Sequence, residues 1–201
     1  MHLIKEFELA KHALDNSQVV SFPTETVMGL GVYYDDEKAY HLLNKIKRRP
    51  EDKPYTLMLG DVKQIDKYAF ISDRDAKIIN SFMPGMITVL LKAKDNIPGY
   101  VTHNSGIIGI RIPNMPEIIE LLNYVKKPLL VPSANRSGQK PCMSSNEVKE
   151  EFKDELGYIF PGEAIGGVPS TIVDLTGEEV KILREGPISR EEIISALKGG
   201  N

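Results

Sequence analysis

The sequence of 201 residues predicts an α/β protein with one twisted sheet and flanking helices. Short apolar runs rich in β-branched residues alternate with segments of helical hydrophobic period along the whole chain. Glycine and proline stand at many of the junctions, where the chain must turn. The sequence contains no internal repeat, low-complexity tract or interdomain linker, which predicts a single domain over residues 1–201.

The composition is that of a globular protein. Hydrophobic residues make up 41% and charged residues 26% of the chain, as in ordinary folded domains. The 25 basic and 28 acidic residues give a formal net charge of −3, so no overall basic character indicates a nucleic-acid or membrane surface. Any site for an anion must therefore be local.

The cysteine and histidine content argues against a metal held by the protein. Cys142 is the single cysteine, which excludes an internal disulfide and a cysteine-pair metal site and fits a reducing compartment. An inert, small hydrophobic side chain is the simplest interpretation of Cys142. The four histidines lack the spacing of metal ligands, so no metal-ligating residue is predicted.

The sequence gives no sign of a membrane or export segment. No apolar run reaches the roughly 18 residues that a membrane-spanning helix needs. The N-terminus, M-H-L-I-K-E-F-E-L-A, lacks the long apolar region of a signal peptide. We therefore expect a cytoplasmic protein without membrane contact.

The first 50 residues predict a helix, a strand and a second helix. Residues 3–14 carry their apolar side chains on one helical face. Residues 19–22 are largely apolar with β-branched valines, and Pro23 ends this strand. Residues 34–50 repeat apolar side chains at helical spacing after an aspartate cap, and Pro50 is expected to stop the helix.

The rest of the chain continues the alternation. A Pro-Gly turn precedes the strand at 87–91, a proline opens the helix at 116–125, and Ser-x-x-Glu capping boxes begin at Ser144 and Ser189. The predicted strands cover residues 55–59, 87–91, 106–112, 129–131, 171–175 and 180–183, and the predicted helices cover residues 61–68, 73–83, 116–125, 144–156 and about 190–198.

Residues 21–31, S-F-P-T-E-T-V-M-G-L-G, are the first candidate for a ligand loop. Thr24 and Thr26 supply hydroxyls, and Gly29 and Gly31 allow a ligand to approach the backbone closely. The same residues would also suit local turns without any ligand. This stretch alone does not decide between the two interpretations.

Cations and a second polar loop supply further candidates. Lys47 and Arg49 lie in the last turn of the second predicted helix, where basic residues ordinarily balance the helix dipole. Arg111 closes an apolar strand, either as an edge residue or as an anion contact. Residues 132–138, P-S-A-N-R-S-G, follow a strand at the kind of position where open α/β sheets bind ligands, although such residues also form plain turns.

Four motifs in one order resemble the YrdC-like threonylcarbamoyl-AMP synthase family. They are P-T-E-T-V-x-G-L-G, then K-x-R-P at Lys47, Arg49 and Pro50, then P-S-A-N-x-S-G at 132–138 and S-T-I-V-D-L-T at 170–176. The resemblance is to the short, single-domain type and runs from about residue 19 to residue 186. It implies that the sheet is mixed and mostly open.

The resemblance also implies a nucleotidyltransferase that acts in tRNA modification. Its substrates would be L-threonine, bicarbonate or CO2, and ATP, and its products threonylcarbamoyl-adenylate and pyrophosphate. A downstream transferase system would then make threonylcarbamoyladenosine in tRNA. The chain has no Walker A, G-x-G-x-x-G or G-x-S-x-G motif, so basic side chains must recognise the phosphates. A carbamate is already an anionic nucleophile, so the protein mainly aligns reactants and neutralises charge.

Residue roles follow from the same resemblance. Lys47 and Arg49 would be catalytic, gripping the triphosphate, and their loss is expected to cost activity far more than stability. Mg²⁺ is expected to accompany ATP, held by phosphates and water. Ser144 also has a sufficient structural explanation as a helix cap. The implied nucleotide contacts are Arg49, Lys53, Asn135, Ser144 and Arg184, and the implied threonine contacts are Thr24, Thr26, Arg111, Ser133 and Ser170.

Two other functions stay open on the sequence alone. The segment K-P-Y-T-L-M at 53–58 resembles YciO-like paralogues, and Met58 stands about where longer relatives carry a histidine. The intact Ser133 and Asn135 favour the synthase. A double-stranded-RNA or nucleotide-binding module without synthase activity would use the basic cluster at 45–53, with an affinity that falls steeply with salt. The acidic overall balance argues against that module.

Overall fold

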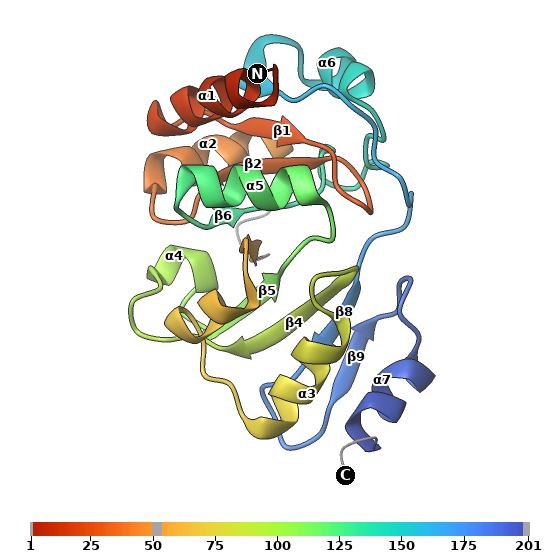
Figure 1. Cartoon of the computed structure of the whole chain (residues 1–201). Coiled ribbons are helices and arrows are strands. Elements are labelled where there is room, and N and C mark those ends of the chain that lie inside the picture. Colours follow the sequence, from red (N-terminus) through yellow and green to blue (C-terminus); the bar gives the residue numbers. More distant parts are fainter. Residues whose placement is uncertain (1, 50–53, 199–201) are drawn as a thin grey trace.

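The computed structural model describes residues 2–49 and 54–198 and has the α/β architecture that the sequence predicts (Figure 1). Its strands are β1 (Val20–Phe22), β2 (Gly29–Tyr33), β3 (Thr56–Met58), β4 (Ile87–Lys92), β5 (Ile107–Arg111), β6 (Leu129–Leu130), β7 (Tyr158–Ile159), β8 (Thr171–Asp174) and β9 (Lys181–Arg184). Within the described residues they form one nine-stranded sheet in the order β7-β1-β2-β6-β3-β5-β4-β8-β9. The pairs β1–β7, β3–β5 and β4–β8 are parallel and the others antiparallel, so the sheet is mixed and open.

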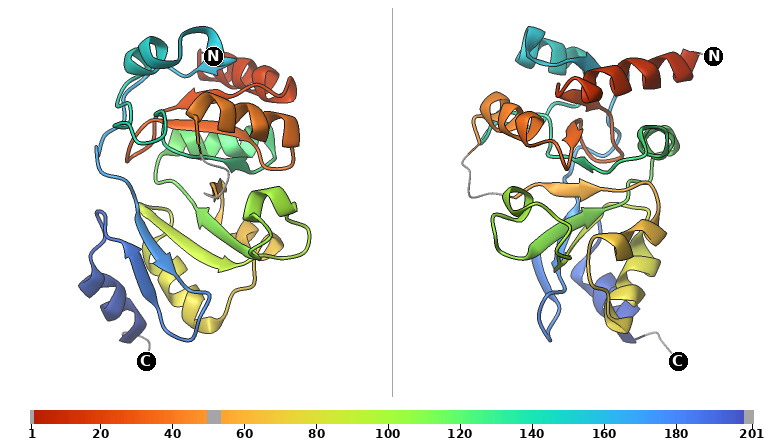
Figure 2. Two further views of the ribbon diagram at one scale, coloured as in Figure 1. Left: turned by 180° about the vertical axis from the view of Figure 1, so that it is seen from behind. Right: turned by 90° about the vertical axis from the view of Figure 1, so that its left-hand side faces the viewer.

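Helices pack at both ends of this sheet. They are α1 (His2–Asp15), α2 (Glu37–Lys47), α3 (Asp73–Phe82), α4 (Gly99–Thr102), α5 (Pro116–Val125), α6 (Ser145–Phe152) and α7 (Arg190–Lys198), with the 3₁₀ helices η1 (Val62–Lys67) and η2 (Lys153–Glu155). Figure 2 shows α1 and α5 near one end of the molecule and α3 beside α7 at the end that carries the C-terminus. No helix within residues 2–49 and 54–198 is long and apolar enough to cross a membrane.

Two clusters of buried hydrophobic side chains stabilise the fold. The first includes side chains of α2, α3 and α7, and the second joins α1 and α5 to the sheet around Phe22. The central strands β3, β5, β4 and β8 contribute alternate residues to the first cluster, namely Leu57, Ile110, Val89 and Val173. Since side chains alternate across a strand, the intervening residues of these strands face the other way.

Part of that other face of the central strands is polar. Ile172 pairs with both Thr88 and Arg184. Arg111 lies opposite Thr88, because Val89 and Ile110 next to them are paired. Side chains in one such row point to the same face of the sheet. The strand register therefore brings two arginines and a threonine from β5, β4 and β9 close together.

Several elements differ from the predicted boundaries. The second helix, α2, ends at Lys47 because Arg48 takes a left-handed conformation (φ 50°) and its N–H bonds back to the last turn. Pro50, which was expected to stop this helix, lies outside the described residues. Within the predicted helix at 61–68, residues 62–67 form the short 3₁₀ helix η1 instead of an α-helix, and α6 ends at Phe152 before η2. The short elements α4 and β7 have no predicted counterpart.

Strand β2 is the main element that the sequence did not predict. Gly29 and Gly31 were grouped with the ligand loop, but they lie inside β2, between β1 and β6. A Cβ on Gly29 would stand 2.9 Å from Cγ1 of Val131, and a Cβ on Gly31 would stand 2.8 Å from Cε1 of Phe22. The two glycines therefore leave space for neighbouring core side chains. The candidate ligand loop is shorter than predicted and consists of the residues between β1 and β2.

We predict that Gly31→Ala destabilises the protein. The added methyl group would overlap Phe22, whose ring is fully buried, and such overpacking costs about 1–3 kcal/mol. The free energy of unfolding from urea titration measures this loss. Gly177→Ala is the matched control, because its nearest contact would be 3.9 Å away and it should unfold like the wild type. Equal midpoints for Gly31→Ala and the wild type would contradict the packing role of Gly31.

Candidate functional site

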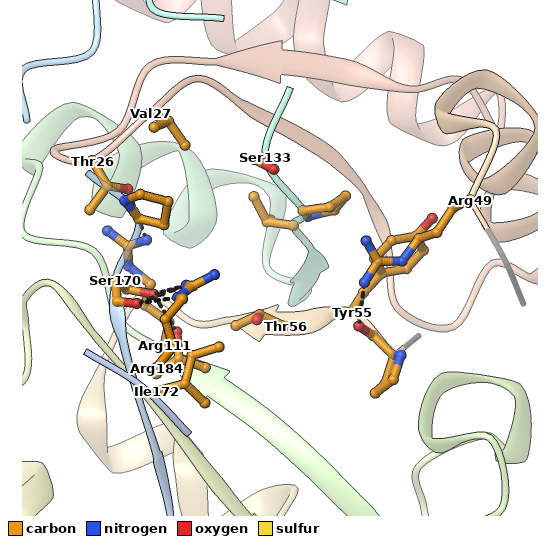
Figure 3. Close-up of a pocket in the computed structure, with 15 residues that line it drawn as sticks. Thr26, Val27, Arg49, Tyr55, Thr56, Arg111, Ser133, Ser170, Ile172 and Arg184 are labelled. Carbon is orange, nitrogen blue, oxygen red and sulfur yellow. Dashed lines mark hydrogen bonds between the residues drawn. The ribbon is translucent and has the colours of Figure 1, made fainter. Parts of the chain in front are cut away.

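A cavity of about 220 Å³ lies between the polar face of the central strands and the loops that follow β1 and β6 (Figure 3). The floor comes from β3, β5, β4, β8 and β9, and the walls come from residues far apart in the sequence. The lining residues are Thr26, Val27, Arg49, Pro54, Tyr55, Thr56, Thr88, Arg111, Val131, Pro132, Ser133, Pro169, Ser170, Ile172 and Arg184.

One end of the cavity, which we call the two-arginine end, is formed by Arg111, Arg184, Thr26 and Ser170 (Figure 3). Thr88 also lines the cavity and belongs to this end through its contact with Ser170. Ser170 and Thr88 share a hydrogen bond of 2.9 Å between their hydroxyl oxygens, and both side chains are buried. Buried hydroxyls and cations are tolerated where they bond to one another and border a cavity. This end therefore presents positive charge and hydroxyl groups to a ligand.

Arg111 is buried and held by two partners. Its Nη1 donates to the Thr26 Oγ1 at 3.0 Å, and its Nη2 lies 2.8 Å from Oε1 of Glu25. The Glu25 oxygen also accepts the backbone N–H of Asn114 at 3.0 Å. Among the described residues, the buried Nε of Arg111 has no hydrogen-bond partner. An unpaired buried donor costs free energy, so an anion in the cavity would be a favourable partner.

Arg184 reaches the same end from β9. Its Nε and Nη2 donate to the Ser170 carbonyl at 3.0 and 2.7 Å. Partial burial lowers the pKa of Arg184 from its ordinary value, and the positive charge of Arg111 lowers that pKa further. Two guanidinium groups that repel each other in this way favour a bound anion.

The opposite end of the cavity, which we call the Arg49 end, has a third cation. The guanidinium of Arg49 lies over the ring of Tyr55, with 4.7 Å between Cζ and the ring centroid. Its Nη2 also donates to the Pro54 carbonyl at 3.1 Å. Figure 3 shows this pair at the far side of the cavity from Arg111 and Arg184, with Ser133 and Thr56 between the two ends.

Ser133 belongs to the loop at residues 132–138 that the sequence singled out. Its hydroxyl donates to Oδ1 of Asn135 at 2.5 Å. The Asn135 amide nitrogen donates to the carbonyls of Arg136 and Gln139 at 2.8 and 2.9 Å. Ser133 lines the cavity whereas Asn135 does not. Asn135 therefore shapes the loop that presents Ser133.

Lys47 lies behind this loop and does not line the cavity. Its side chain is buried, and its Nζ donates to the carbonyls of Ser133 and Asn135 at 2.5 and 2.7 Å. Burial lowers the pKa of Lys47 to about 7, and the charge of Arg49 adds to this shift. These two bonds argue against the expectation that losing Lys47 would spare stability, because its Nζ holds two loop carbonyls.

Two other predicted contacts, Thr24 and Ser144, lie away from the cavity lining. The Thr24 hydroxyl donates to the Val27 carbonyl at 2.6 Å, accepts the Thr26 N–H at 3.2 Å and thus forms a local turn. Ser144 accepts the Glu147 N–H at 3.2 Å and caps α6. The local turn and the helix cap therefore account for Thr24 and Ser144 without a ligand. Lys53 lies outside the described residues.

Three polar residues that line the cavity were not predicted from the sequence, namely Tyr55, Thr56 and Thr88. Thr88 interrupts an apolar strand with a polar side chain, which is the signal that could have drawn attention to it. Tyr55 and Thr56 begin β3 just after the basic cluster. Their placement depends on the strand register, which the sequence does not specify.

The described residues contain no group of three or more His, Cys, Asp or Glu side chains that could hold a metal ion. Cys142 is buried, and this burial raises the pKa of its thiol to about 11. A thiol with so high a pKa is largely protonated at neutral pH, so it is a poor nucleophile. The cavity therefore offers positive charge, hydroxyls and backbone groups, and it suits the binding of anions.

Comparison with known proteins gives consistent similarities along nearly the whole chain. The family model of the Sua5, YciO and YrdC proteins, described as telomere recombination, matches residues 12–186. A putative threonylcarbamoyl-AMP synthase of Methanocaldococcus jannaschii is 35% identical over 190 residues, which are 94% of this chain and 89% of that protein. The threonylcarbamoyl-AMP synthase of Vibrio campbellii is 32% identical over 91% of this chain and 100% of its own length.

Solved structures of similar fold include two of clear sequence similarity. The Pyrococcus abyssi protein Sua5, determined in complex with L-threonine, superposes with a TM-score of 0.89 at 31% identity. The match covers 96% of this chain and 57% of that protein, so this chain spans little more than half of it. Escherichia coli YciO superposes with a TM-score of 0.87 at 25% identity, covering 94% of this chain and 93% of that one.

We predict that Lys47 makes stability depend on pH between about pH 7 and 9. The folded-state pKa of about 7 lies below the ordinary value of 10.5, so the unfolded chain binds the Lys47 proton more readily in this interval. The free energy of unfolding of the wild type should therefore rise relative to that of Lys47→Met as pH increases. Urea titrations of both proteins at pH 7, 8 and 9 measure the difference, and parallel curves would contradict it.

Proposed function

The chain belongs to the Sua5, YciO and YrdC family, and on this basis we propose that it is a threonylcarbamoyl-AMP synthase. The relatives that carry this name are 32–35% identical over most of the chain. The enzyme would convert L-threonine, bicarbonate and ATP into threonylcarbamoyl-adenylate, pyrophosphate and water. Bicarbonate and the threonine amine form the carbamate with loss of water. A carbamate oxygen then attacks the α-phosphorus, and pyrophosphate leaves.

One observation carries this proposal, namely that the cavity has cationic groups at two separate ends. Threonine carries one carboxylate, and ATP carries a triphosphate. A cavity with cations at both ends would hold the two substrates side by side and bring the carbamate into line with the α-phosphorus. Alignment and charge neutralisation of this kind supply much of the catalysis in phosphoryl and nucleotidyl transfer.

We assign threonine to the two-arginine end. Arg111 has an unpaired buried Nε in the described part of the chain, and a charge-assisted hydrogen bond from it would fix the carboxylate. Thr26, Ser133 and Ser170 supply hydroxyls at the cavity surface. Arg184 was expected beside the nucleotide, but its bonds to the Ser170 carbonyl favour a role at this end.

We assign the nucleotide phosphates to the Arg49 end. A guanidinium fork suits phosphate oxygens, and Arg49 is a lining residue. Lys47, Asn135 and Ser144 would act on the nucleotide through the loop and helix that they hold, since none of them lines the cavity. Lys53 stays a candidate phosphate contact.

Mg²⁺ fits this site only as a companion of ATP. The described residues offer no carboxylate or imidazole cluster for a metal, so the phosphates and water would supply its ligands. When bound, the ion would neutralise phosphate charge. The same proposal includes the next step, in which a separate threonylcarbamoyl transferase system in the cytoplasm transfers the product to tRNA. It also includes any contact of this protein with RNA.

A YciO-like protein without synthase activity is the second candidate. The YciO structure resembles this chain nearly as closely as the Sua5 structure does, and the segment K-P-Y-T-L-M resembles that branch. Met58 from this segment is buried in the second hydrophobic cluster and does not line the cavity. The intact Ser133 at the cavity surface supports the synthase.

We predict that the protein releases pyrophosphate from ATP and Mg²⁺ only when threonine and bicarbonate are both present. Omission of each reactant in turn, followed by a coupled pyrophosphate assay, tests this requirement. Release that is independent of threonine would indicate a different nucleotidyl acceptor. A folded protein that binds ATP but releases no pyrophosphate under any condition would favour the YciO-like candidate.

We predict that Thr26→Val raises KM for threonine about tenfold and changes KM for ATP little. Valine keeps the shape of the side chain but removes the acceptor that holds Arg111 Nη1 at 3.0 Å, and such a bond contributes about 1–1.5 kcal/mol. Arg49→Ala is the reciprocal variant and should mainly raise KM for ATP. An equal rise in KM for threonine and KM for ATP in either variant would contradict the division of the cavity into two ends.

A further inference from the structure

The side chain of Arg49 has a defined support, although it lies beyond the end of α2. Its guanidinium lies over the Tyr55 ring, and its Nη2 bonds to the Pro54 carbonyl (Figure 3). An arginine side chain has about 2 kcal/mol of rotamer entropy to lose when it is fixed by a ligand. A support that fixes the guanidinium beforehand lowers this cost of binding.

The Tyr55 ring is itself held rigidly. Tyr55 is buried, and its hydroxyl donates to Oδ1 of Asn44 at 2.5 Å. The ring of Tyr40 meets it edge to face, with centroids 5.7 Å apart and planes at 69°. A hydrogen bond at the tip and a perpendicular ring at the side together fix the plane of the Tyr55 ring.

Asn44 connects this support to the backbone of Arg49. Its side chain accepts the Tyr55 hydroxyl, and its backbone carbonyl accepts the N–H of Arg49 at 3.1 Å. One residue in the last turns of α2 thus positions both the start of the arginine side chain and the ring beneath its guanidinium. This arrangement couples the end of the helix to the start of β3.

We infer that Tyr55 is a positioning residue for nucleotide binding, which holds the Arg49 guanidinium ready for a phosphate, and that Asn44 fixes Tyr55 for this purpose. The inference rests on the proposed function, because it takes Arg49 as a ligand of the ATP phosphates. Tyr55 contributes through the face of its ring, which attracts a cation. Its hydroxyl contributes only by holding the ring in place.

A double-mutant cycle on ATP affinity tests this role. The dissociation constant of ATP and Mg²⁺ is measured by isothermal titration calorimetry for the wild type, Tyr55→Leu, Arg49→Ala and the double variant. Tyr55→Leu alone should weaken binding roughly three- to tenfold, the range expected for a partly desolvated cation–π contact. In the Arg49→Ala background the same substitution should have almost no effect, because the group that Tyr55 positions is gone.

Tyr55→Phe is the matched control, since it keeps the ring and removes only the hydroxyl. It should weaken ATP binding less than Tyr55→Leu does, because the ring face under Arg49 remains and only the bond to Asn44 that fixes the ring is lost. In the pyrophosphate assay, Tyr55→Leu should raise KM for ATP and leave KM for threonine unchanged. A variant that is partly unfolded would instead lose activity without a specific rise in KM for ATP. Circular dichroism spectra would detect such unfolding.

The outcomes separate this inference from the proposed function. If Tyr55→Leu weakens ATP binding equally in the wild-type and Arg49→Ala backgrounds, Tyr55 contacts the nucleotide directly or supports the fold in general. That result would overturn only the positioning role. An unchanged affinity in Tyr55→Leu would also overturn it. A wild-type protein that does not bind ATP at all would overturn the proposed function itself.

Discussion

The structure depends on a sheet whose central strands are apolar on one face and carry arginines and hydroxyls on the other. The first face packs against α3 and α7, where hydrophobic burial stabilises the fold. The second face buries Arg111, which is tolerated because Glu25 pairs with it and a cavity adjoins it. Apolar residues on this second face would remove the site. The pairing of the central strands therefore determines both the hydrophobic core on one face and the cavity on the other.

The loop at residues 132–138 is the second constraint, because it carries Ser133 to the cavity and is held from two sides. Lys47 bonds to its carbonyls from α2. Arg136 bonds from the loop to Glu151 of α6 at 3.0 Å, and its guanidinium lies over the ring of Phe152. A loop fixed in this way presents its serine without a large entropic cost on ligand binding. The helix that supplies Lys47 also leads into Arg49, so one element supports both the loop and the Arg49 end.

The sequence predicted the class of fold, most elements and the family, because hydrophobic period and motif order are local properties of the chain. It did not predict β2, since two glycines in a short apolar stretch are typical of loops, and only the close approach of Phe22 and Val131 explains them. The site was predicted in part. Arg111, Ser133 and Ser170 line the cavity, whereas Thr24 and Ser144 satisfy backbone groups nearby. Which polar residue turns toward a cavity depends on register and burial, and neither follows from residue type.

The proposed function requires that one cavity be divided between an amino acid and a nucleotide. A crystal structure of the protein with L-threonine and a non-hydrolysable ATP analogue would test it most directly. We expect the threonine carboxylate within hydrogen-bond distance of Arg111 and the triphosphate beside Arg49. Threonine at the Arg49 end, or a triphosphate between Arg111 and Arg184, would contradict this division of the cavity.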